Sequence, residues 1–132
     1  MIVLDTHALI WWVAANEKLS KKARALILKH ENDDRSILVS AITAWEIAML
    51  VIKGRLTLNM DVSAWLSQVG RISAVRFVPV DNTVGVESAT LPGDFHKDPA
   101  DRMIVALARQ GAYPLLTADK KMHAYKYVKT VW

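Results

Sequence analysis

The sequence has no cysteine, only five glycines and four prolines, and no apolar run longer than residues 8–15. Without cysteine the chain can form no disulfide, no zinc–thiolate site and no thiol nucleophile. The longest apolar run is much shorter than the roughly 18 residues of a membrane-spanning helix. The first residues also lack the basic segment and cleavage site of a secretory signal. We therefore expect a cytoplasmic protein that does not contact a membrane.

Two glycine-dependent catalytic motifs are also missing. The sequence contains no glycine-rich phosphate loop, and no Gly-x-Ser-x-Gly turn of the kind that presents a nucleophilic serine. These absences argue against a P-loop nucleotide hydrolase and against a serine hydrolase of the α/β type. Any catalysis must therefore rest on other side chains.

The composition is that of an ordinary globular protein. The 132 residues are 52% hydrophobic and 23% charged, which is enough apolar material for a core. We expect a single domain that spans residues 1–132. The 17 basic residues exceed the 13 acidic residues, which gives a formal net charge of +4 and a mild preference for an anionic partner.

Short apolar segments alternate with helical patterns along the whole chain. We expect strands at residues 1–4, 37–39, 77–80, 115–117 and 127–131. We expect helices at residues 6–15, 20–30, 42–53, 61–69, 82–91 and 98–111, a loop at residues 31–35, and a short helical turn from residue 119. Pro79 suggests a strand end or an edge strand. Strands this apolar are buried on both faces, so the pattern predicts an α/β fold with a parallel sheet between two helix layers.

Several acidic residues follow the predicted strands. Asp5 and Asp119 come directly after the first and fourth strands, and Glu46 lies one turn into the helix after the second. Asp98 and Asp101 open a later helix. Ligands of open parallel sheets bind at the carboxyl ends of the strands, so we expect these side chains to share one edge.

Each acid also has a purely structural interpretation. Asp5, Asp98 and Asp119 could each cap a helix, and Asp101 occupies a helical position where a carboxylate suits the helix dipole. Glu46 lies on a mostly apolar stripe and could be a buried carboxylate bonded to a backbone amide. The joint pattern favours a site, because acids gathered at one edge repel one another unless a cation lies between them.

Oxygen ligands without cysteine or paired histidines favour Mg²⁺ or Mn²⁺ over zinc. Such cations polarise a phosphate and activate water, so the pattern indicates hydrolysis of a phosphodiester or phosphoryl group. Thr6 and Thr117 adjoin the acids and could orient a ligand or water. Lys120 and Lys121 could contact a phosphate backbone, although a solvated face explains them equally well.

The histidines and tryptophans carry weaker signals. His7 could contact substrate or pack on a neighbour, whereas His30, His96 and His123 lack metal-ligand spacing and suit solvated or capping positions. Trp11-Trp12 and Trp65 fall on predicted helices, where core or interface positions are commoner than base-stacking platforms.

Four segments resemble the PIN-domain ribonucleases, in particular the VapC-type toxins of toxin–antitoxin pairs. They are IVLDTHALIWW, VSAITAWEIA followed by KGRL, HKDPADRMIVALA, and LLTADKKM, and they cover residue 2 to about residue 131 in the family's order. The resemblance implies a three-layer PIN-like fold with a five-stranded parallel sheet. It also implies an endoribonuclease that depends on Mg²⁺ or Mn²⁺.

The resemblance implies a role for each acid. Asp5, Glu46, Asp101 and Asp119 match the family's four catalytic and metal-binding acids, with Asp5 and Asp101 as the principal metal ligands. Asp98 matches an additional acid of one subgroup and is interpreted as a cap or supporting residue. Leu50 departs from the pattern, since similar sequences often have lysine there.

The resemblance also implies partners: an RNA substrate, a cognate VapB-type antitoxin that blocks the acidic cleft, and a second copy of the chain in a homodimer or higher oligomer. One alternative is a PIN-fold module that binds RNA or a partner without cleavage. Another is a receiver-like phosphotransfer domain in which Asp81 accepts the phosphoryl group, although no second acid adjoins Asp5.

Overall fold

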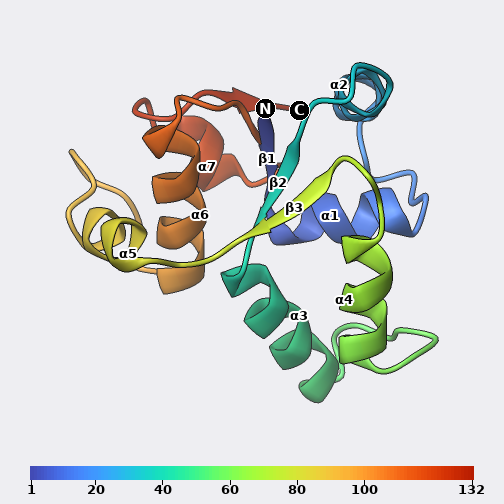
Figure 1. Ribbon diagram of the computed structural model, residues 1–132. Helices are drawn as coiled ribbons and strands as arrows, with labels where there is room; N and C mark the ends of the chain where they lie inside the picture. Colours follow the sequence, from blue (N-terminus) through green and yellow to red (C-terminus); the bar gives the residue numbers. More distant parts are fainter.

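The computed structural model describes all residues from 1 to 132. Its centre is a parallel five-stranded sheet in the order β3-β2-β1-β4-β5 (Figure 1). The strands are β1 (Ile2–Leu4), β2 (Ile37–Ser40), β3 (Val75–Val78), β4 (Leu115–Leu116) and β5 (Thr130–Val131). The helices are α1 (Thr6–Val13), α2 (Lys21–Asn32), α3 (Ile42–Ile52), α4 (Val62–Gly70), α5 (Asn82–Ala89), α6 (Pro99–Gln110) and α7 (Lys120–Ala124).

Helices cover both faces of the sheet. The core on one face joins side chains of α1, α2, α3 and α4 to β1, β2, β3 and β4, whereas the other joins α5, α6 and α7 to β1, β2 and β4. Figure 1 shows α1 and α4 on one side of the strands and α5 and α6 on the other. Successive residues of β1 alternate between the two cores: Ile2 and Leu4 enter the first and Val3 the second. The predicted three-layer α/β fold is confirmed.

The strand order excludes the receiver alternative. β1 lies between β2 and β4, whereas receiver domains place their first strand between the second and third. Asp81, the candidate phosphoryl acceptor, instead caps α5, and its Oδ1 accepts a hydrogen bond from the Val84 amide.

Several predicted boundaries were wrong. The third strand is Val75–Val78 rather than 77–80, because Pro79 has no amide hydrogen to extend the ladder and because exposed Arg76 broke the apolar run that a buried strand would show. β3 is an edge strand, as Pro79 suggested. The last strand contains only Thr130–Val131, α2 continues to Asn32 into the predicted loop, and α5 stops at Ala89.

No helix of this fold has the length and apolar character required to cross a lipid bilayer.

Candidate active site

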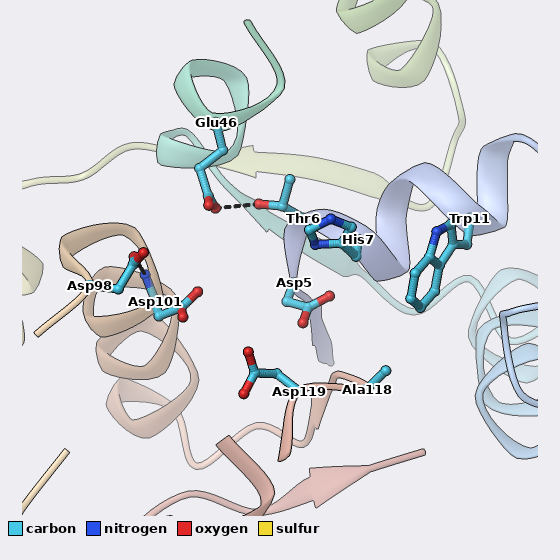
Figure 2. A pocket seen from close by; sticks show the side chains of 9 residues that line it. All are labelled: Asp5, Thr6, His7, Trp11, Glu46, Asp98, Asp101, Ala118 and Asp119. Carbon is cyan, nitrogen blue, oxygen red and sulfur yellow. Dashed lines mark hydrogen bonds between the residues drawn. The ribbon is translucent and has the colours of Figure 1, made fainter. Parts of the chain in front are cut away.

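A cavity of about 410 Å³ opens at the carboxyl ends of the central strands β1 and β4. Figure 2 shows the side chains around it. They are Asp5, Thr6, His7, Trp11, Glu46, Asp98, Asp101, Ala118 and Asp119. All four predicted catalytic acids therefore share one cavity, as does the additional acid Asp98. The acids come from the segments after β1 and β4 and from α3 and the start of α6, so only the folded chain assembles them.

Asp5 is the most deeply placed acid. It follows β1, is only 6% exposed, and caps α1 through a hydrogen bond that its Oδ1 accepts from the Ala8 amide at 2.8 Å. Burial raises the pKa of Asp5, although a hydrogen bond from the Thr117 hydroxyl opposes the rise. Capping thus explains one oxygen of Asp5. It does not explain why the carboxylate lies among other acids.

Glu46 reaches the cavity from α3 and is held by a hydroxyl group. The Thr6 Oγ1 donates to Glu46 Oε1 at 2.5 Å and lies 3.1 Å from the Thr43 Oγ1 (Figure 2). Burial raises the pKa of Glu46, and the hydrogen bond from Thr6 opposes the rise. The backbone-amide partner considered for a buried Glu46 is therefore not its partner. Thr6 orients this carboxylate, a supporting position that the sequence had indicated.

Asp98 and Asp101 enter from the first turn of α6. Asp98 caps the helix, because its Oδ1 accepts from the Asp101 amide at 3.0 Å. Glu46, Asp98 and Asp101 each offer a carboxylate oxygen within 4.8 Å of the others. Asp98 is therefore both a helix cap and a member of the acidic cluster, a combination that the sequence interpretation had left open.

Asp101 is repelled by the other acids of the cavity. Burial raises its pKa to about 7, and repulsion from Asp98, Glu46, Asp119 and Asp5 adds to the rise. No lysine or arginine forms a salt bridge with any of these acids. The nearest cationic candidate is His96, whose Nε2 lies 3.0 Å from Asp101 Oδ2 without the geometry of a hydrogen bond. The cavity thus concentrates negative charge that the protein does not neutralise.

The neighbouring Arg102 fixes the loop that carries His96. Its Nε donates to the Ser88 carbonyl at 2.7 Å, and its Nη1 donates to the carbonyls of Phe95 and His96 at 3.1 and 3.2 Å. The Phe95 ring meets the His96 ring edge-on, with centroids 4.4 Å apart. His96 is half-buried beside Asp101, so the predicted solvated position was wrong.

Asp119 approaches from the loop after β4. The Thr117 Oγ1 accepts a hydrogen bond from the Asp119 amide at 3.0 Å, and Asp119 Oδ1 caps α7 by accepting from the Lys121 amide at 2.7 Å. Thr117 therefore contacts two of the acids, which fits its predicted supporting position. The exposed side chains of Lys120 and Lys121 are not among those that line the cavity.

The structure shows which tryptophans lie in the core and which one lines the cavity, a distinction that the sequence did not make. Trp65 is 7% exposed within the core. Trp11 and Trp12 both pack partly buried against that core, and Trp11 also lines the cavity together with exposed His7. The spacing of His7 and Trp11 by four residues was the available signal, because it places both on one face of a helix.

The donor set fits a hard divalent cation. The cavity offers carboxylate and hydroxyl oxygens, no sulfur, and one exposed imidazole. Mg²⁺ and Mn²⁺ prefer oxygen ligands, and a cation would offset the mutual repulsion that raises the pKa of Asp101. The acidic residues therefore fit such an ion.

Comparison with known proteins identifies the family. The PIN domain model matches residues 2–127, nearly the whole chain. The chain belongs to the PIN domain family. Over 133 aligned residues, this PIN domain is 33% identical to ribonuclease VapC22 of Mycobacterium tuberculosis, covering 99% of the chain and 98% of the relative.

Solved structures share the fold at lower sequence identity. VapBC2 from Rickettsia felis, bound to a DNA fragment from its promoter, matches with a TM-score of 0.69 and 14% identity, covering 99% of this chain and 98% of that chain. DNA-bound VapBC from Salmonella typhimurium matches with a TM-score of 0.68 and 18% identity over the same shares. The predicted PIN-like architecture is thereby confirmed.

Proposed function

We propose that this PIN domain is a metal-dependent endoribonuclease and the toxin of a VapBC-type pair. The observation that carries the proposal is the convergence of five carboxylates in one cavity, without a lysine or arginine partner, at the carboxyl ends of the central strands. The 33% identity to a ribonuclease, over 99% of this chain and 98% of that protein, supports RNA as the substrate class. Capping alone would not bring Glu46 to the other acids.

In this proposal, Asp5, Glu46, Asp101 and Asp119 form the catalytic and metal-binding set, with Asp5 and Asp101 as principal ligands. Mg²⁺ or Mn²⁺, when bound, would polarise a phosphodiester oxygen and lower the pKa of a water. Thr6 holds the Glu46 carboxylate at a fixed position. Thr117 and Asp98 orient their neighbours Asp119 and Asp101 through hydrogen bonds that involve the backbone amides of those neighbours.

The raised pKa values suit this role. Burial and mutual repulsion favour the protonated carboxyl groups, and a divalent cation bound among them would displace those protons and favour the ionised form. The acids of the chain thus bind the cation, and Thr6 and Thr117 orient those acids. The net positive charge outside the cavity attracts the RNA backbone.

We infer the partners of this chain from the solved structures that it resembles. Two of the similar structures are VapBC complexes with DNA, which supports a VapB-type antitoxin as the partner of this chain. Self-association into a homodimer or higher oligomer and residence in the cytoplasm, where RNA is available, complete the proposal.

The proposal is tested by incubating the purified protein with Mn²⁺ and end-labelled single-stranded RNA, beside DNA of the same sequence. We expect discrete RNA fragments and intact DNA. We also expect that co-purified antitoxin suppresses the cleavage. RNA that is bound but never cut would instead support the non-cleaving binding module, and the nuclease proposal would fail.

A further inference from the structure

The cavity has two chemically different ends. Glu46, Asp98 and Asp101 form the acidic end, and aromatic rings of α1 form the other (Figure 2). His7 and Trp11 lie one helical turn apart, with ring centroids separated by 5.6 Å. Asp5 lies between the acids of α6 and this aromatic pair in Figure 2. The proposed metal site does not use these rings.

The Trp11 ring is held in place without being enclosed. Its centroid lies 5.8 Å from that of Trp132, and the Lys18 ammonium is 5.8 Å from the Trp11 ring. Trp11 packs partly buried against the core, yet part of it borders the cavity. Trp65, by contrast, is 7% exposed within the core and does not line this cavity.

We propose that His7 and Trp11 form a stacking subsite for one nucleobase of single-stranded RNA, next to the phosphate held at the acids. The subsite rests on the proposed ribonuclease function and adds how the substrate is placed. An aromatic ring accepts any base on its π-face, so the subsite fixes the position of the strand without selecting its sequence. The Lys18 ammonium beside the ring offers a cation to the adjoining phosphate backbone.

The dimensions and charges support an RNA occupant. A cavity of about 410 Å³ falls within the range of pockets that bind small ligands. The acids require a cation before a phosphate can approach, whereas the aromatic end can hold an uncharged base directly. One nucleotide carries both groups, and its sugar joins them.

Binding of an unstructured RNA tests the subsite. The parent is the wild-type protein in Ca²⁺, a cation that takes oxygen ligands and that we expect to occupy the acids without supporting cleavage. The probe is a ten-residue oligouridine, and its binding is measured by fluorescence anisotropy. Adding Trp11→Ala should weaken binding by about tenfold, the scale of one base stacked on one aromatic ring. Trp11→Phe should retain most of the affinity. Trp45→Ala removes a tryptophan that is 57% exposed and outside the cavity, and it should leave the affinity unchanged.

Abasic probes separate stacking from a structural effect. Replacing each nucleotide of the probe in turn by an abasic residue should reveal one position at which the parent loses about tenfold in affinity. With Trp11→Ala present, that position should cost nothing further. An unchanged affinity in Trp11→Ala, an abasic penalty that persists in that variant, or no RNA binding by the parent would each overturn the subsite.

The two proposals fail in different ways. If wild-type protein never cuts RNA but the abasic pattern depends on Trp11, the nuclease proposal fails and the stacking subsite stands. If wild-type protein cuts RNA and Trp11→Ala changes neither affinity nor the abasic pattern, the subsite fails and the nuclease proposal stands. In the second case, Trp11 would be an ordinary packing residue or a contact for a protein partner.

Discussion

Replacing Asp101 by asparagine should abolish RNA cleavage while the fold survives. Asp101 belongs to the three-acid cluster with Glu46 and Asp98, and every other acid of the cavity repels its carboxylate. Loss of a residue that only orients a metal ligand typically costs about 10- to 100-fold, so loss of a direct ligand should cost more than about 100-fold. Cleavage rates in Mn²⁺, measured beside thermal unfolding of the same samples, give the result. Asp5→Asn should behave alike.

Asp61→Asn is the matched control. Asp61 caps α4 through its Oδ1 and lies outside the cavity, and asparagine caps a helix about as well as aspartate does. This variant loses one negative charge, as Asp101→Asn does, but it should cleave RNA at the wild-type rate. An Asp101→Asn protein that retains a tenth of the wild-type rate would contradict the assigned role.

Without metal, the stability of the protein should fall as the pH rises from about 4 to about 7. Asp101 has a pKa of about 7 in the fold against an ordinary value of 3.8, so the native state binds more protons than the unfolded state across this window. The loss of stability starts near the pKa that Asp101 has in the unfolded chain and is complete above the pKa that it has in the fold. Without solvent screening a shift of this size corresponds to about 4 kcal/mol, or a decrease in Tm of roughly 15 °C. Screening of this partly exposed carboxylate reduces the effect, so we expect a decrease of several degrees. The raised pKa values of Asp5 and Glu46 act in the same direction.

Thermal unfolding in EDTA at a series of pH values measures this effect. Asp101→Asn should flatten the dependence and raise the Tm at pH 8, because it removes the repelled charge. Mg²⁺ or Mn²⁺ should raise the wild-type Tm at pH 8 and have much less effect on the variant, since an ion that binds only the folded state stabilises it. A wild-type Tm that increases from pH 4 to pH 7 in EDTA would show that the acids are compensated within the protein.

The sequence was informative about the acidic residues that follow the ends of predicted strands. Short, wholly apolar segments predicted a parallel sheet, and parallel strands bring their carboxyl ends to one edge. The strand ends therefore predict that Asp5 and Asp119 lie together, and that Glu46 joins them from the helix after β2. The resemblance of four short motifs then supplied the family, which the comparison confirmed.

The remaining features depend on tertiary contacts that a linear pattern does not encode. His96 lies beside Asp101 on a loop whose carbonyl groups accept hydrogen bonds from Arg102, and no spacing rule links that arginine to a histidine six residues earlier. Trp11 and Trp12 are neighbours in one helix, yet only the packing of α1 on the sheet decides which of them meets the cavity. Likewise, the edge strand β3 includes the exposed residue Arg76. A search for apolar runs therefore misses the first half of this strand.

The most direct test of the central claim is RNA cleavage by purified protein that has been stripped of metal with EDTA and then titrated with Mn²⁺. The five acids of the cavity predict no cleavage in EDTA and a rate that rises to saturation as Mn²⁺ is restored. Cleavage that continues at full rate in EDTA, or folded protein that stays inactive on RNA at saturating Mn²⁺, would contradict it.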